Sequence, residues 1–124
     1  MTDPTSFYTG WLVDPEQRPQ LLARFPPRYA DLVAHHVTLK FGDRTAEPPG
    51  AVSAAIVGEA DDEAGVQAMV VRIDGATARP DGGTFHITWS LAAGREARES
   101  NDVIAAHGWT LIEPPAPVRL TPKP

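Results

Sequence analysis

The feature that most constrains the fold of this chain is a pair of runs in which polar and apolar residues alternate. The first run covers residues 36–41 (HVTLKF) and the second covers residues 85–91 (FHITWSL). A period of two is typical of a half-buried β-strand, because successive side chains of a strand point to opposite faces. We therefore expect the apolar residues of each run to face a core and the polar residues to share the other face.

Both runs carry the same polar pattern, a histidine followed two residues later by a threonine. The pairs are His36 with Thr38 and His86 with Thr88. Two residues of a strand rise about 6.6–6.8 Å, so each strand presents an imidazole and a hydroxyl about 7 Å apart on one face. The function of the chain is predicted from these two pairs.

Size and composition limit the classes of function. The chain has 124 residues, no cysteine and a formal net charge of −5. We expect one domain over residues 1–124, with residues 1–6 as a loose tail, and neither disulfides nor thiolate metal sites. An acidic chain lacks the basic surface that binding to a long duplex requires. No run is long and apolar enough for a membrane span, and no leader pattern is present, so a cytoplasmic protein without a cofactor is expected.

The remaining elements are read from periodicity, prolines and glycines. Further strands are expected at 7–13, 51–59, 66–73, 109–112 and 118–120, and helices over much of 16–24 and from Ser100 to Gly108. Each half of the chain then holds a helix, a histidine strand and an adjoining strand. This echo predicts a bilobal α+β fold, in which two small antiparallel sheets with flanking helices form a central cleft that carries both His-x-Thr motifs.

Two imidazoles with threonines suit phosphodiester chemistry without a metal. A base must act on the entering oxygen and an acid on the leaving oxygen, and imidazole fills either role near neutral pH. Threonine hydroxyls can donate hydrogen bonds to the charged phosphate oxygens. We therefore predict His36, Thr38, His86 and Thr88 as the catalytic residues, with no metal.

Other polar residues are candidates for substrate binding, each with a structural alternative. Lys40 shares the predicted face of His36 and is either a phosphate contact or a surface lysine. Ser90 is its neutral counterpart on the second strand, or a plain strand residue. Tyr8 is a candidate for stacking on a base. His35 points away from His36 if the strand is regular, and it is interpreted as a capped or packed histidine.

The two runs also resemble a known family. Residues 36–42 look like the first motif, and residues 85–91 match the second His-x-Thr, of the two-histidine (2H) phosphoesterase superfamily. The stretch from Phe7 to the first motif, and residues 99–102, resemble the cyclic phosphodiesterase domain of tRNA ligases and its small relatives in RNA repair. The resemblance implies a bilobal fold and metal-independent opening of a 2′,3′-cyclic phosphate. It also gives Ser100 and Asn101, first of all a helix start, a second interpretation as polar contacts at the cleft rim.

The leading hypothesis is therefore a cyclic phosphodiesterase whose partners are RNA 2′,3′-cyclic phosphate ends or small cyclic nucleotides. The alternative is a module that binds a nucleotide or RNA end in the same cleft without cleaving it. A structural domain that binds no ligand is the third possibility. The roles of the two histidines, the isomer of the product and the substrate stay open at this stage.

Overall fold

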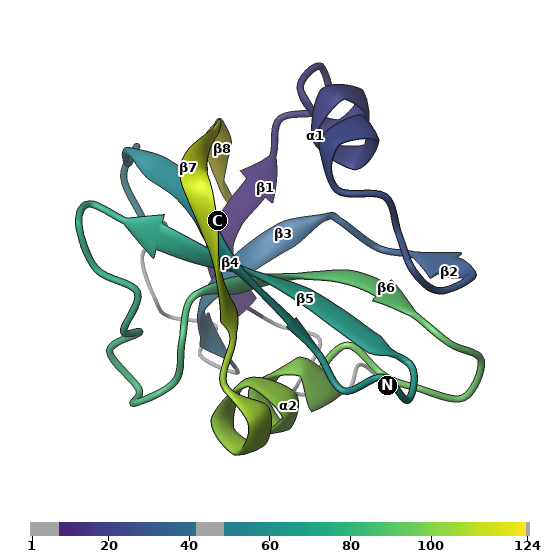
Figure 1. Cartoon of the computed structure of the whole chain (residues 1–124). Helices are drawn as coiled ribbons and strands as arrows, with labels where there is room; N and C mark the ends of the chain where they lie inside the picture. The colour runs from purple at the N-terminus through teal and green to yellow at the C-terminus, as the bar shows by residue number, and fades with distance from the viewer. Residues whose placement is uncertain (1–7, 42–48, 124) are drawn as a thin grey trace, which may run out of the picture.

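The chain folds mainly into antiparallel strands. The computed structural model describes residues 8–41 and 49–123, and Figure 1 shows their eight strands and two helices. In chain order these are β1 (Tyr8–Val13), α1 (Arg18–Arg24), β2 (Asp31–Leu32), β3 (His36–Phe41), β4 (Ala54–Asp61), β5 (Val66–Ile73), β6 (His86–Leu91), α2 (Glu99–His107), β7 (Thr110–Val118) and β8 (Leu120–Lys123). The predicted tail, residues 1–6, lies outside the described residues.

All of these strands belong to one sheet. The strand order is β7-β4-β5-β6-β3-β1-β8, with β2 also paired to β6, and every pairing is antiparallel. The prediction of an antiparallel α+β fold is confirmed, but its division into two small sheets is wrong. The reason is the pairing of Val37 in β3 with Ile87 in β6, which joins the two halves of the chain at the histidine strands themselves. Residues 8–41 and 49–123 therefore do not divide into two separate lobes with a cleft between them.

The C-terminal segment connects both edges of this sheet. Val118 at the end of β7 pairs with Ala54 of β4, and Leu120 at the start of β8 pairs with Val13 of β1. Only Arg119 separates the two strands, and its guanidinium lies 3.0 Å from a carboxylate oxygen of Asp14. Because one short segment reaches both edges, the sheet curls into a half-barrel (Figure 1).

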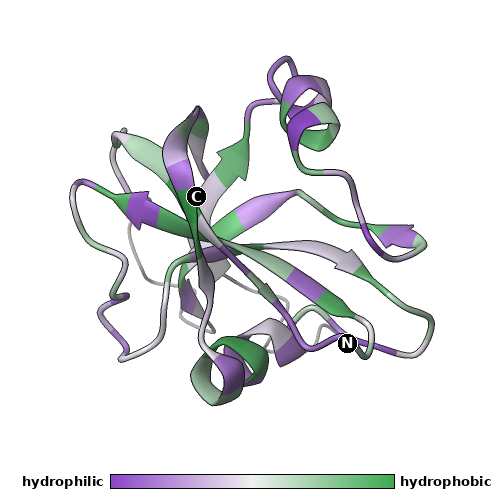
Figure 2. Ribbon diagram, in the orientation of Figure 1, coloured by the Kyte–Doolittle hydropathy of each residue, from purple (hydrophilic) through white to green (hydrophobic). Residues whose placement is uncertain are grey.

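Two clusters of apolar side chains cover the two faces of the sheet. The first contains Val37, Ile87 and Trp89 and includes Leu21 of α1, whereas the second includes Val103 and Ile104 of α2. Figure 2 shows hydrophobic and hydrophilic residues on both helices, as expected of helices that cover a core with one side.

The polar residues of β6 lie on the side of the sheet that α2 covers. His86 pairs with Val70 and Thr88 pairs with Ala68, and both of these β5 residues belong to the α2 cluster. Helix α2 thus packs beside the second His-x-Thr motif. None of the described helices is long and apolar enough to cross a membrane.

Candidate functional site

The two His-x-Thr motifs lie on neighbouring strands. Val37 and Ile87, the middle residues of the motifs, pair with each other and are both fully buried in the core. Since alternate residues of a strand point to opposite faces, the histidines and threonines of both motifs share the other face. The structure thus brings together the four residues that the sequence predicts as catalytic.

The register between β3 and β6 is broken beside His36. The N–H of Ala34 donates to the carbonyl of Thr88 at 2.9 Å, while Val37 pairs with Ile87. His35 and His36 therefore have no opposite residue between Thr88 and Ile87, and they form a bulge. Ala34, which begins the bulge, is fully buried and has a φ of 44°, in the left-handed region. Bulges redirect side chains, and this one changes the direction of His35.

The bulge places the ring of His35 against that of His36. Their Nδ1 atoms are 3.1 Å apart, and the ring centroids are 5.3 Å apart at an interplanar angle of 80°. The expectation that His35 points away from His36 is wrong because it assumed a regular strand. A contact between two Nδ1 atoms requires one to donate and the other to accept, so the tautomers of the two rings are coupled.

The electrostatic surroundings keep His36 neutral at pH 7. Burial, followed by the charges of His35, His86 and Lys123, lowers the pKa of the half-buried His36 to about 4. His86 is therefore close enough to His36 for one ring to influence the protonation of the other. A neutral imidazole is able to accept a proton.

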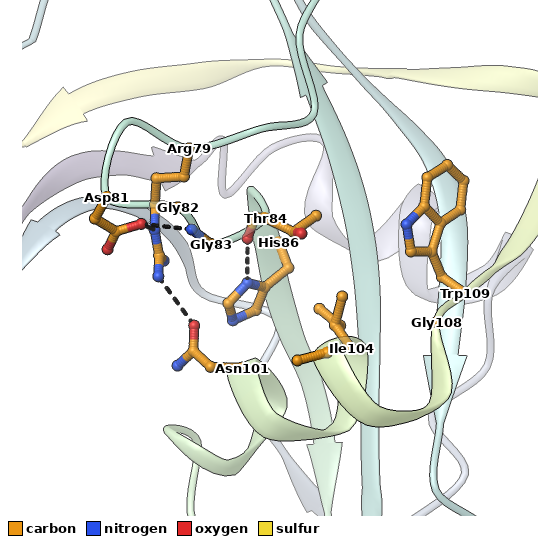
Figure 3. A pocket seen from close by; sticks show the side chains of 11 residues that line it. Arg79, Asp81, Gly82, Gly83, Thr84, His86, Asn101, Ile104, Gly108 and Trp109 are labelled. Carbon is orange, nitrogen blue, oxygen red and sulfur yellow. Dashed lines mark hydrogen bonds and ion pairs between the residues drawn. The ribbon is translucent and has the colours of Figure 1, made fainter.

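His86 is buried and held by a backbone carbonyl. Its Nδ1 lies 2.8 Å from the carbonyl oxygen of Thr84, and since a carbonyl only accepts, Nδ1 carries the hydrogen. Burial and then the charge of Arg79 lower the pKa of His86, whereas the Thr84 carbonyl and the charge of Asp81 oppose this shift. Figure 3 shows the other ring nitrogen, Nε2, turned toward the space between the ring and Asn101.

His86 also lines a pocket of about 380 Å³ between α2 and the loop that precedes β6 (Figure 3). Arg79, Asp81 and Asn101 line it together with His86, and Ile104 and Trp109 give it an apolar end. His36 is not among its lining residues. The pocket thus includes the histidine of the second motif but not that of the first, in contrast to the predicted central cleft that both motifs line.

A buried arginine organises the polar end of this pocket. The side chain of Arg79 is 5% exposed, and its Nε donates to Asp81 at 2.8 Å while its Nη2 donates to Asn101 at 3.1 Å. Asp81 also accepts the N–H of Gly83, and the bond from Arg79 is the largest cause of its lowered pKa. Asn101, for which the family resemblance implies a polar contact at the rim of the cleft, is a lining residue of this pocket. Arg79 and Asp81 were missed because a glycine-rich loop carries no periodic signal, and Trp109 was expected only as the first residue of a strand.

The second threonine attaches α2 to the sheet. The buried hydroxyl of Thr88 donates to the carbonyl of Ala97 at 3.2 Å, and it lies 2.9 Å from the hydroxyl of Ser100. Because the single hydrogen of Thr88 is used on Ala97, Ser100 is the donor in the second bond. Ser100 was also expected to begin the helix, but α2 begins at Glu99 and Arg98 is its N-cap residue.

Two of the predicted substrate-binding residues are fully buried. Ser90 donates to the side-chain oxygen of Gln67 at 2.6 Å and accepts the backbone N–H groups of Arg28 and Tyr29, each at 3.2 Å. Ser100 is also fully buried and makes the bond to Thr88 described above. Ser90 and Ser100 thus hold loops and helices to the sheet rather than contacting a substrate.

The other candidates lie on the β1–β3 side of the site. Lys40 is exposed on β3, and Thr38 is buried and pairs with Gly10 of β1. A Cβ at Gly10 would lie 2.1 Å from the carbonyl oxygen of Val37, so a glycine is needed for β1 to approach the first motif. The backbone of Tyr8 begins β1, but its side chain is outside the described part of the structure.

Comparisons with known proteins do not assign this site. No family model, no curated protein and no solved structure matches the chain. Within residues 8–41 and 49–123, no group of three or more histidine, aspartate or glutamate side chains is arranged to hold a metal ion. The function is therefore argued from the geometry of the site.

Proposed function

We propose that this protein is a metal-independent phosphodiesterase that opens a 2′,3′-cyclic phosphate, at an RNA end or on a small cyclic nucleotide, to a phosphomonoester. The observation that carries the proposal is the pairing of Val37 with Ile87, which sets two His-x-Thr motifs on one face of adjacent strands. Acid–base catalysis at one phosphorus needs two proton-transfer groups that reach the same small ligand. The charge of His86 is one of the causes that lower the pKa of His36, and this supports the arrangement.

In the proposed reaction His36 is the base and His86 the acid. A water oxygen attacks phosphorus and gives its proton to Nε2 of His36, while the bond from phosphorus to one ribose oxygen breaks and that oxygen takes the proton of His86 Nε2. The carbonyl of Thr84 favours the protonated form of His86, whereas each cause acting on His36 disfavours its protonation. A bound phosphodiester anion would add to this difference by raising the pKa of the ring that donates to it.

This assignment requires a particular tautomer of His36. Its Nε2 accepts a proton only if Nδ1 already carries one, and the neighbouring Nδ1 of His35 is placed to accept that hydrogen at 3.1 Å. His35 would thus act on His36 as the Thr84 carbonyl acts on His86. In this proposal it is a positioning residue.

The direct test is incubation with 2′,3′-cyclic mononucleotides and with an oligonucleotide that ends in a cyclic phosphate, with the 2′- and 3′-phosphate products separated. We expect turnover that EDTA leaves unchanged and that His36→Ala and His86→Ala each reduce by about 10²–10⁴-fold, the usual contribution of one acid or base. Loss of turnover with EDTA would contradict the proposal. Tight binding of the cyclic phosphate without product, unchanged in the double histidine variant, would instead identify a binding module.

A further inference from the structure

The pocket beside His86 has two chemically different ends. Among its lining residues, Arg79, Asp81, Asn101 and His86 lie toward one end, and Ile104, Gly108 and Trp109 lie toward the other (Figure 3). Its volume of about 380 Å³ is at the lower end of the range of small-molecule sites, about 300–1,000 Å³. A ligand that fills it should therefore be small, with one polar and one flat apolar part.

The apolar end contains an indole that the sheet holds in place. A Cβ built on Gly58 of β4 would lie 2.1 Å from Cε3 of Trp109, so the absence of a side chain at Gly58 lets the indole rest directly on the strand. Trp109 is nevertheless 38% exposed, whereas Trp11 and Trp89 are buried in the core. An aromatic ring that is fixed on one side and open to a pocket is a stacking platform for a nucleobase.

The polar end carries charge and hydrogen-bond donors. The guanidinium of Arg79 is held by Asp81, whose carboxylate balances its charge, and by Asn101, so the end that His86 lines has an ion pair and fixed hydrogen-bonding groups. The amide nitrogen of Asn101 gives one hydrogen to the carbonyl of Arg98 at 2.9 Å, which leaves its second hydrogen able to bind a ribose or base oxygen. The two ends of the pocket thus match the two ends of a nucleotide.

We propose that this pocket binds the nucleoside part of a nucleotide, with the base stacked on Trp109 and the phosphate at His86. The inference rests on the proposed function only in placing the phosphate at His86. If the base binds here, the substrate is a nucleoside cyclic phosphate or the terminal nucleotide of an RNA, rather than a cyclic phosphodiester without a base. Specificity then comes from one nucleotide, in agreement with the acidic charge of the chain.

The test measures binding of adenosine 3′-monophosphate, which has no cyclic bond to open, and of inorganic phosphate to the full chain. Trp109→Leu removes the aromatic plane and Trp109→Phe retains one. Leu111→Ala is the matched control, since Leu111 follows closely on β7, is 59% exposed and does not line the pocket. We expect Trp109→Leu to weaken binding of the nucleotide about tenfold or more, Trp109→Phe and Leu111→Ala to weaken it less than threefold, and none of them to change binding of phosphate. Binding of the nucleotide should also quench wild-type tryptophan fluorescence, and this quenching should be absent in Trp109→Phe.

The inference is overturned if wild-type protein binds the nucleotide no better than phosphate, or if Trp109→Leu and Leu111→Ala lower the affinity equally. Its failure is separable from that of the proposed function. Binding that depends on Trp109, without opening of any cyclic phosphate, supports the nucleoside site and refutes the phosphodiesterase. Opening of cyclic nucleotides with an unchanged KM in Trp109→Leu refutes the nucleoside site alone.

Discussion

The two His-x-Thr motifs have the same residues but lie in very different surroundings. The motif on β6 is in the middle of the sheet, where every residue of the strand is buried and β5 pairs along most of its length. A backbone carbonyl holds His86, and the bonds to α2 hold Thr88. The motif on β3 makes one residue pair with β6, begins in a bulge, and has its histidine half-buried against His35.

A repeated motif thus need not have the same role at both of its positions. On β6 the backbone fixes the histidine and the threonine secures a helix, so the motif is partly structural. On β3 the ring of His36 lies against the side chain of His35. This asymmetry fits His86 as an acid that is rigidly held and His36 as a base whose protonation is set by its neighbours.

Substitution of His36 or His86 should have the largest effects on catalysis. With His36 as base and His86 as acid, the active form has His36 neutral and His86 protonated. We therefore expect a bell-shaped kcat/KM profile, with its acid limb at the pKa of His36, about 4, and its basic limb below 6.5 at the lowered pKa of His86. The residual activity of His36→Gln, about 10²–10⁴-fold lower, should lose the acid limb, and that of His86→Gln the basic limb.

The measurement is the rate of opening of a cyclic mononucleotide from pH 3.5 to 8, for the wild-type chain and both variants. If each variant loses the limb expected of the other, the roles of acid and base are exchanged. Unchanged limbs in both variants would contradict the participation of the two histidines.

Substitution of the two threonines should change the stability of the protein to different extents. Thr88→Val leaves the buried hydroxyl of Ser100 without its acceptor and removes the bond to Ala97, so we expect a loss of about 1–3 kcal/mol in the free energy of unfolding. Thr38 makes no contact with a helix in the described part of the structure, so Thr38→Val should cost less stability, while it lowers kcat. Urea unfolding of the two variants, combined with the kinetics, tests this. An equal loss of stability in both would remove the structural distinction between the motifs.

Stability should also depend on pH through His36. Its pKa is about 4 in the folded protein and 6.5 in the reference state, so the unfolded chain takes up the proton first as pH falls. The free energy of unfolding should therefore decrease below pH 6.5 and stop responding to His36 below about 4. Allowing for solvent screening at a half-buried ring, we expect a decrease of about 1–2 kcal/mol between pH 7 and 5.

Urea unfolding at several pH values measures this decrease, and His36→Gln is the control that should remove part of it. His86 shifts in the same direction, so some dependence should remain in the variant. The carboxyls of Asp62 and Asp81 have reference pKa values of 3.8 and lowered pKa values in the fold, so their contribution falls at lower pH. Equal pH dependence in wild type and His36→Gln would contradict the shifted pKa of His36.

Local sequence patterns predict some elements of this fold and site and not others. The strands at β3, β5 and β6 and both helices follow from local periodicity, and so does the shared face of the four motif residues. The joining of both halves into one sheet depends on the pairing of Val37 with Ile87, which no local pattern encodes. The burial of Ser90 and Ser100 depends on partners far along the chain, such as Gln67 and Thr88. The contact between His35 and His36 arises from a bulge, which period-two reasoning cannot foresee.

The smallest of the predicted effects concerns the contact between His35 and His36 in that bulge. His35→Phe keeps an aromatic ring against His36 but removes the nitrogen 3.1 Å from its Nδ1, so the hydrogen on Nδ1 loses its acceptor. We expect more of the neutral His36 to carry its hydrogen on Nε2, as read from nitrogen chemical shifts, and kcat to fall several-fold while KM stays unchanged. His35→Asn, whose side-chain oxygen can accept the bond, should recover part of the rate. If His35→Phe changed neither the tautomer nor kcat, the contact would be only packing, and the two motifs would differ in burial but not in how their histidines are oriented.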